Sequence, residues 1–210
     1  MADFSAVDHF VVAGPDLAAL GEWWADAVGS NAVEGGAHTG LGTRNLLAGI
    51  DSSTYVELIG PDPDQPDPSG PRPFGIDDVT DRRLVTFALA VPDLDAACAA
   101  VSASGIDPGE PFGMERTRPD DVRLQWRLSF PPDPELAGVM PFLIEWGTSA
   151  HPAADLPSQA RLTRLSLQHP NAARIETAVS ALAGDSWRVA QGPAKLSASL
   201  ETPDGRLVDL

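Results

Sequence analysis

Residues 36–60 read GAHTGLGTRNLLAGIDSSTYVELIG, a pattern that predicts two strands joined by a turn. Side chains alternate between two faces of the second strand, residues 54–59, so Val56 and Leu58 share one face. Glu57 lies on the other face, between apolar neighbours. An ionised carboxylate in the middle of such a strand is costly unless a cation, a metal ion or hydrogen-bond donors face it. The stretch therefore predicts a buried polar site around Glu57.

The composition excludes several classes of partner. The chain has 210 residues, is 43% hydrophobic and carries a formal net charge of −16. That charge repels phosphate backbones and anionic lipid surfaces, so we expect neither nucleic acid nor a membrane as partner. The single cysteine, Cys98, offers no disulfide and no thiolate metal site. No apolar run approaches the length of a membrane span and the N-terminus has no signal-peptide pattern, so we expect a cytoplasmic protein.

The predicted elements repeat along the chain. The first unit comprises a strand at 7–13, a helix between Asp16 and Gly29, and strands near 31–34, 43–48 and 54–59. The second has a strand at 84–91, a helix at 94–104, and strands at 122–130 and 141–146. The third has a strand at 161–167, a helix to about residue 182, and strands at 187–190, 195–201 and 206–210. The repetition predicts an α+β protein built from β-α-β-β-β modules.

The same boundaries predict the domain organisation. Modules 5–60 and 83–147 form one domain over residues 5–147, and the Pro/Asp-rich segment 61–82 is a linker or surface loop between them. A third module at 160–210 leaves an odd sheet with an unpartnered edge. We expect it to pack on the first two modules or on its counterpart in another subunit, in which case the protein is a homodimer.

Four segments give the chain a resemblance to a known family. They are DHFVV at 8–12, HTGLGTRN at 38–45, YVELI at 55–59 and PFLIEW at 141–146. In these segments the sequence resembles the vicinal-oxygen-chelate superfamily, and within it the glyoxalase-like group of bacterial proteins. The resemblance implies paired modules whose curved mixed sheet surrounds a cup, with helices outside. It also implies a divalent metal that is held by the first and last strands of each module and chelates two neighbouring substrate oxygens.

The resemblance further implies a ligand set. By position the metal ligands are His9, Glu57 and Glu145, and the fourth position is Thr86, where many family enzymes have histidine. One imidazole and two carboxylates suit Fe(II), Mn, Ni or Zn, with open positions for a substrate. Threonine is a poor ligand, and Thr86 is expected to contact the substrate instead. Glu57 and Glu145 occupy equivalent strands, so the implied arrangement brings their carboxylates together as the catalytic pair.

Other polar residues are candidates for substrate binding, and each has a structural alternative. His38 follows two glycines and either touches the ligand or fixes the turn by hydrogen bonds. Asn45 points toward the ligand or toward the backbone, and Arg127 meets an anionic substrate or pairs with an acidic loop. His9 could be an ordinary core histidine. His151 precedes a proline in a loop and is expected to be structural.

Two classes of function remain open from the sequence. The first is a metal-dependent lyase, isomerase or dioxygenase acting on a small oxygen-rich molecule, in which a carboxylate shuttles the proton. The second is a metal-free protein that binds a small hydrophobic molecule or drug on the same scaffold. A fold alone does not choose between them.

Overall fold

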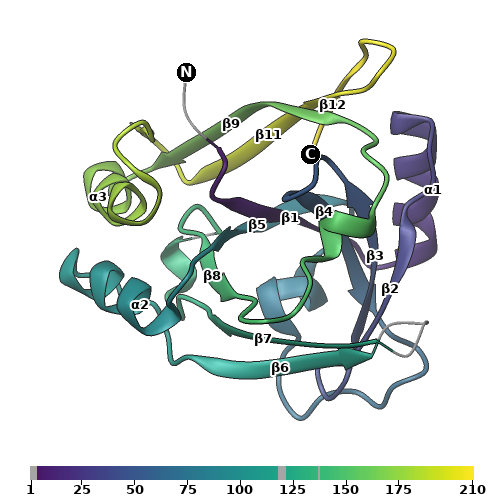
Figure 1. The fold of residues 1–210 in the computed structure, drawn as a ribbon, viewed down its shortest axis with the longest axis horizontal. Coiled ribbons are helices and arrows are strands. Elements are labelled where there is room, and N and C mark those ends of the chain that lie inside the picture. The colour runs from purple at the N-terminus through teal and green to yellow at the C-terminus, as the bar shows by residue number, and fades with distance from the viewer. Residues whose placement is uncertain (1–3, 118–121, 137) are drawn as a thin grey trace.

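The computed structural model describes residues 4–117, 122–136 and 138–210 (Figure 1). Its larger sheet has eight strands in the order β2-β3-β4-β1-β5-β8-β7-β6. The first module supplies β1 (Val7–Ala13), α1 (Leu17–Val28), β2 (Val33–His38), β3 (Thr43–Gly49) and β4 (Tyr55–Pro61). The second supplies β5 (Arg83–Ala90), α2 (Leu94–Ala103), β6 (Phe112–Thr117), β7 (Arg123–Ser129) and β8 (Phe142–Glu145). Three 3-10 segments interrupt the connections: η1 (Pro73–Asp78), η2 (Pro134–Leu136) and η3 (Pro152–Asp155).

Both helices of these modules begin at an aspartate cap. The Asp16 side chain accepts hydrogen bonds from the backbone N–H groups of Ala18 and Ala19, and Asp93 accepts one from Ala96. These acceptors satisfy donors that a helix N-terminus leaves unpaired. Helix α1 ends at Gly29, whose φ of 81° is a conformation that glycine adopts without steric cost.

The first two modules have the same strand pairing and meet in the middle of the sheet, where β1 pairs with β5. Strand β1 pairs in parallel with β4, and β5 pairs in parallel with β8, while β1 and β5 run antiparallel with Phe10 opposite Phe87. The sheet curls until its two ends nearly meet, with the helices outside (Figure 1). The predicted α+β class and the curved mixed sheet around a cup are thereby confirmed. The sequence patterns missed one strand of the second module, β6.

The third module has the predicted element order, but its strands pair differently from those of the first two modules. It comprises β9 (Arg161–His169), α3 (Ala172–Ala183), β10 (Val189–Gln191), β11 (Lys195–Glu201) and β12 (Leu207–Asp209). The strand order is β10-β9-β11-β12, so its first strand pairs with the second and third. In the first module the first strand pairs with the last. The third module is therefore not a copy of the other two.

The third module packs within the same chain. The Trp187 ring, two residues before β10, stacks on Phe87 of β5 with centroids 6.0 Å apart and planes 8° from parallel. Helix α3 lies beside α2, and Figure 1 shows the small sheet covering β1 and β5. Residues from all three modules, including Phe10, Leu94 and Ile175, share the outer hydrophobic core. The third module thus packs on the first two modules of its own chain and does not need a second subunit to cover it. The homodimer stays a prediction.

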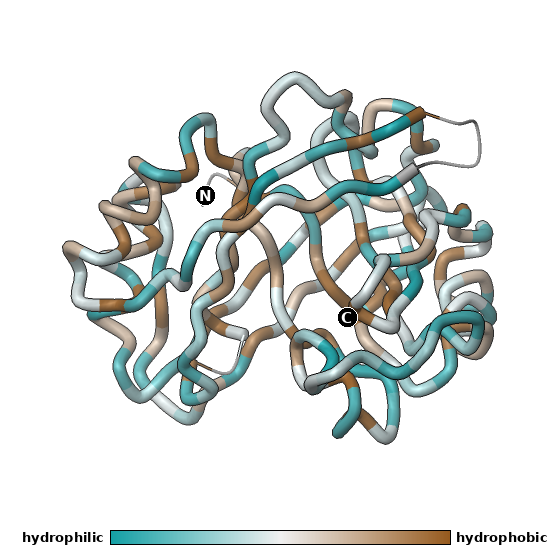
Figure 2. Tube along the Cα trace, turned by 90° about the horizontal axis from the view of Figure 1, so that it is seen from below, coloured by the Kyte–Doolittle hydropathy of each residue, from teal (hydrophilic) through white to brown (hydrophobic). Residues whose placement is uncertain are grey.

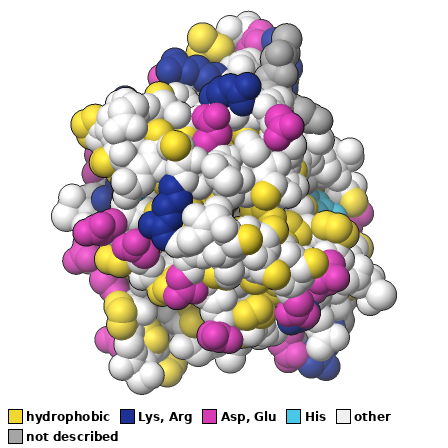
Figure 3. All heavy atoms as spheres, turned by 90° about the vertical axis from the view of Figure 1, so that its left-hand side faces the viewer, with side chains coloured by type: hydrophobic (Ala, Val, Ile, Leu, Met, Phe, Trp, Pro, Cys, Tyr) yellow, Lys and Arg dark blue, Asp and Glu magenta, His cyan; other side chains and the backbone are white. Residues whose placement is uncertain are grey.

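Hydrophobic and hydrophilic residues are interspersed along the tube in Figure 2. The central strands β1, β4 and β5 are buried along nearly their whole length. On the face that carries α2 and α3, acidic side chains outnumber basic ones, in keeping with the net charge of −16 (Figure 3). Within the part of the chain that the structure describes, no helix is long and apolar enough to cross a membrane.

Candidate functional site

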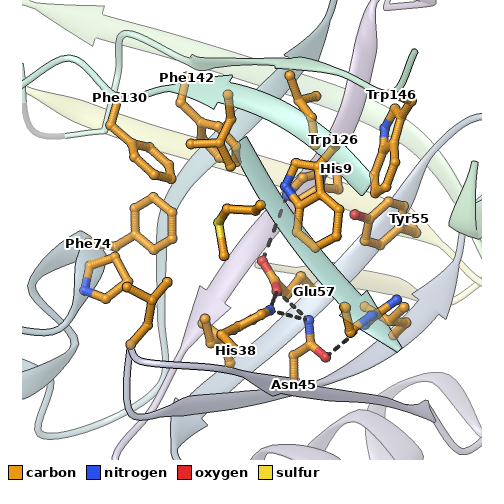
Figure 4. Close-up of a pocket in the computed structure, with 18 residues that line it drawn as sticks. His9, His38, Asn45, Tyr55, Glu57, Phe74, Trp126, Phe130, Phe142 and Trp146 are labelled. Carbon is orange, nitrogen blue, oxygen red and sulfur yellow. Dashed lines mark hydrogen bonds and ion pairs between the residues drawn. The ribbon is translucent and has the colours of Figure 1, made fainter. Parts of the chain in front are cut away.

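A largely apolar cavity lies inside the curled sheet (Figure 4). The centres of water molecules can occupy a volume of about 60 Å³ in this cavity, several times the ~10–15 Å³ that one water needs. Its aromatic walls come from Tyr55, Phe74, Trp126, Phe130, Phe142 and Trp146. Its polar side chains are His9, His38, Asn45, Glu57 and Arg116. The polar groups converge at one side, which leaves an aromatic half and a hydrogen-bonding half.

Glu57 faces this cavity, as the alternation of β4 predicts. It is 7% exposed, and its Oε1 accepts a 2.5 Å hydrogen bond from Nδ2 of Asn45. The Nε2 atom of His38 lies 3.5 Å from the same oxygen, and Nε2 of His9 lies 3.7 Å from Oε2. The buried carboxylate therefore meets hydrogen-bond donors and imidazoles from β1, β2 and β3.

His38 and Asn45 line the cavity and also hold each other in place. Nδ1 of His38 is 2.9 Å from Oγ1 of Thr43, and its Nε2 is 3.2 Å from Nδ2 of Asn45. Burial lowers the pKa of His38, although the nearby charge of Glu57 acts in the opposite direction. His38 thus lines the cavity and also forms a contact beside the β2–β3 turn, and its contact with a ligand stays a prediction.

Arg116 reaches the same cluster from β6 across the seam of the curled sheet. Its Nη1 donates to Oδ1 of Asn45 over 3.3 Å. The chain leaves room for this contact at Gly35, where an added Cβ would lie 2.1 Å from that Oδ1 and 2.7 Å from Nη1 of Arg116. A side chain at residue 35 would displace both groups, so a close approach explains the glycine.

The imidazole of His9 contacts the carboxylate of its sequence neighbour Asp8 on the side away from Glu57. Nδ1 of His9 lies 2.6 Å from Oδ1 of Asp8, and the imidazole stacks on Tyr55 with ring centroids 4.6 Å apart. Asp8 is fully buried and accepts a 2.8 Å hydrogen bond from Nε1 of Trp146. Burial by itself raises the pKa of Asp8, but hydrogen bonds from His151 and His9 outweigh it and lower the pKa to about 2. The environment of Asp8 therefore favours its ionised form.

Three residues that the sequence predicts at the site, Glu145, Arg127 and Thr86, do not line the cavity. Glu145 lies on the outer face of β8, because Phe142 and Ile144 of that strand face inward. It pairs with Arg127 over 3.3 Å, and Arg127 also forms a 2.8 Å ion pair with Asp95 of α2. The expected approach of the Glu57 and Glu145 carboxylates is therefore absent, and Arg127 pairs with acidic side chains of a helix and a strand and not of the acidic loop that was its structural alternative. A shift of one residue in a strand moves a side chain to the opposite face, which accounts for Glu145.

The implied metal set is not assembled. Thr86 is buried in β5 opposite Val11 but does not line the cavity, and Glu145 lies outside it. Of the four implied positions only His9 and Glu57 meet, and the Asn45 amide already occupies one oxygen of Glu57. Over the described ranges 4–117, 122–136 and 138–210, no group of three His, Cys, Asp or Glu side chains is arranged as a metal site. The residues present therefore do not fit the divalent metal that the family resemblance implies.

Sequence reasoning missed several cavity residues. Arg116 and Met114 lie on β6, where Phe112, Met114 and Arg116 alternate with other residues in a pattern that could have indicated a strand. Phe74 lies in the segment interpreted as a linker. Its φ of 60° is left-handed, and the ring packs against Phe130 with centroids 5.0 Å apart. No local pattern signals such a position.

Comparisons with known proteins agree with this architecture. The family model for the glyoxalase-like domain matches residues 7–183. No curated protein matches the chain. A crystal structure of a hypothetical protein from Staphylococcus aureus has 15% identity, a TM-score of 0.67 and 97% coverage of both chains, which shows a shared fold that includes the third module.

Two methylmalonyl-CoA epimerase structures resemble a smaller part of the chain. The Mycobacterium tuberculosis enzyme has 22% identity and a TM-score of 0.46, covering 70% of this chain and 93% of its own. A variant of the Streptomyces coelicolor enzyme in complex with 2-nitronate-propionyl-CoA has 17% identity and a TM-score of 0.49, covering 68% and 98%. At these values the likeness carries no conclusion about activity.

Proposed function

The chain belongs to the glyoxalase-like domain family, and we propose that its cavity binds a small organic molecule whose polar group faces Glu57. One observation carries the proposal: Glu57 is a buried carboxylate at one side of a cavity whose other walls are aromatic and aliphatic. An apolar pocket with a few convergent polar groups is the usual form of a small-molecule site.

The walls indicate the chemistry of the ligand. The rings of Trp126, Phe130 and Phe142 offer flat apolar surface that favours an aromatic or compact hydrophobic body. Oε2 of Glu57 lies 3.7 Å from Nε2 of His9, and no described residue gives it a donor as close as the Asn45 amide on Oε1. Oε2 is therefore the acceptor available to a hydroxyl or N–H group of the ligand. The best candidate is therefore a small ring compound that carries a hydrogen-bond donor.

A second candidate function is proton transfer of the isomerase or lyase type. The observation that favours it is the pair formed by Oε2 of Glu57 and Nε2 of His9, which are 3.7 Å apart at the cavity. Glu57 would take a proton from a carbon of the bound molecule and return it at a neighbouring carbon, and His9 would take a proton from a neighbouring hydroxyl and give it back. The metal-dependent version of this chemistry, and dioxygenase chemistry, has no assembled donor set here and is not part of the proposal.

Binding is tested by screening small aromatic alcohols, phenols and ketones by thermal shift and confirming hits by calorimetry. Glu57→Gln keeps the shape but removes the charge, and Glu145→Gln is the matched control on the outer face. A hydrogen bond to a charged group is worth about 1.5–3 kcal/mol, so Glu57→Gln should weaken a hit roughly tenfold or more. Glu145→Gln should leave its affinity unchanged. Equal affinity in wild type and Glu57→Gln would refute the proposed anchor.

Proton transfer is tested separately with the same hits in D₂O. Wild-type protein should exchange an acidic C–H of a bound ketone for deuterium, which mass spectrometry detects, and Glu57→Gln should abolish the exchange. If binding depends on Glu57 but no hit exchanges faster than in buffer, the binding function stands and the second candidate fails.

A further inference from the structure

Asp8 and His9 are sequence neighbours whose side chains contact each other, which a regular strand does not allow because successive side chains point to opposite faces. The register of β1 against β5 explains the contact. Val7 pairs with Leu89 and His9 pairs with Ala88, so Asp8 is an extra residue in a β-bulge. Bulges next to sites re-aim side chains. Here the bulge places the Asp8 carboxylate behind the imidazole of His9.

Two side chains from a distant segment hold that carboxylate. Nε1 of Trp146 donates to Oδ2 over 2.8 Å, and Nε2 of His151 lies 3.0 Å from the same oxygen. Residues 146 and 151 flank the turn that follows β8, far from Asp8 in sequence. Both oxygens of a fully buried carboxylate are therefore engaged, Oδ1 by His9 and Oδ2 by the distant pair.

The hydrogen bonds determine which nitrogens carry protons. Nδ1 of His151 accepts from the backbone N–H of Ala153 over 3.2 Å, so its proton lies on Nε2 and is donated to Asp8. Oδ2 of Asp8 already accepts from both Trp146 and His151, so the buried group acts as a carboxylate acceptor and Nδ1 of His9 is the donor to Oδ1. That leaves Nε2 of His9 directed at Glu57 and the cavity.

The geometry points to Asp8 as a positioning residue, which Trp146 and His151 hold in place and which fixes His9 with its proton on Nδ1 and its Nε2 toward the cavity. The inference deepens the proton-transfer candidate and rests on it for its functional meaning. The hydrogen bond made by one ring nitrogen sets the protonation of the other, so Asp8 decides which atom of His9 faces a bound molecule. Trp146 links this arrangement to the ligand, because its ring also lines the cavity.

The test is two-dimensional ¹⁵N–¹H correlation of histidine-labelled protein without ligand, at a pH where His9 is neutral. In wild type the His9 signals should show a protonated Nδ1 and a bare Nε2. In Asp8→Asn the Nδ1-protonated pattern should be lost, because an amide can donate as well as accept and so does not require a proton on Nδ1 of His9. His169→Gln is the control, since His169 contacts the Glu135 carbonyl and the Asn171 N–H and not Asp8. Unchanged His9 signals in a folded Asp8→Asn protein would overturn the inference.

If Asp8→Asn does not fold, Trp146→Phe and His151→Phe take its place. Each removes one donor from Oδ2 and leaves the carboxylate, so the His9 Nδ1–H proton resonance should shift as Oδ1 becomes a stronger acceptor. No shift in either variant would also overturn the inference. Because these spectra need no ligand, they are independent of the binding screen. A correct tautomer with no ligand binding would sink the proposed function alone, and the reverse result would sink this inference alone.

Discussion

Asn45 donates a 2.5 Å hydrogen bond to Glu57 through Nδ2 and accepts one from Arg116 through Oδ1. The three side chains come from β3, β4 and β6, and β6 is the strand at the far end of the curled sheet. One neutral amide thus separates a carboxylate from a guanidinium inside the cup and ties its two ends together. Buried charges are tolerated when hydrogen-bonded partners of this kind surround them.

Removing this amide should destabilise the protein. Asn45→Ala removes one hydrogen bond from Glu57 and one from Arg116, and loss of a partner from a buried polar group costs about 1–3 kcal/mol. Urea unfolding should show a loss of that size. Asn31→Ala, at an exposed position, is the control and should change the free energy of unfolding by less than about 0.5 kcal/mol. Equal stability of both variants would mean that Asn45 does not hold the cluster.

Asp8 predicts an acid-dependent loss of stability. Its folded pKa of about 2 lies below the unfolded value of 3.8, so the unfolded chain binds more protons in this range. The carboxylate therefore adds stability that is complete above about pH 5 and is lost as the pH falls through 2, a contribution of about 2 kcal/mol. Unfolding measured from pH 6 to pH 2 should be less pH-dependent in Asp8→Asn than in wild type. Parallel curves for the two proteins would contradict this.

Glu145 should be irrelevant to any divalent-metal affinity of the protein. Its carboxylate lies on the outer face with Arg127, away from His9 and Glu57. Calorimetric titration with Mn²⁺, Ni²⁺ or Zn²⁺ should give the same result for wild type and Glu145→Ala. A weaker metal affinity in Glu145→Ala would restore the ligand set that the family resemblance implies.

Phe74 should limit access to the cavity. Its ring packs on Phe130 and Phe142, with centroids 5.0 and 5.5 Å away, from the segment between the first two modules. Phe74→Ala should increase acrylamide quenching of tryptophan fluorescence, because Trp126 and Trp146 line the same cavity. Phe112→Ala, which removes a ring 41% exposed, should change it little. Equal quenching in both variants would show that Phe74 does not cover the cavity.

Trp187 should anchor the third module to the first two. It is 2% exposed and stacks on Phe87, so Trp187→Ala should cost about 3–5 kcal/mol in chemical unfolding. Its Nε1 has no hydrogen-bond partner within the described structure, so Trp187→Phe should be much less harmful than Trp187→Ala. If both variants cost the same, the ring stacking is not what joins the modules.

The sequence by itself determined the element order and the inward face of the first module. The capping aspartates 16 and 93 mark the helix starts, and the period of two in β4 sends Glu57 to the cavity. Asn45 is marked as a candidate because it is polar inside a strand, and His38 because it follows two glycines. These signals are local: each depends on neighbours a few residues away, and local backbone preferences carry them.

Only the tertiary structure decided which polar groups meet there. The segment of Glu145 resembles that of Glu57, but Glu145 lies one position away from the inward-facing residues of its strand and points outward. The bulge at Asp8 turns the Asp8 side chain toward His9. Arg116 and His151 join the cluster across 71 and 143 residues of sequence. The third module repeats the element order with a different strand pairing. Register, bulges and pairing across the sheet depend on how distant strands pack, and no periodicity within one strand encodes them.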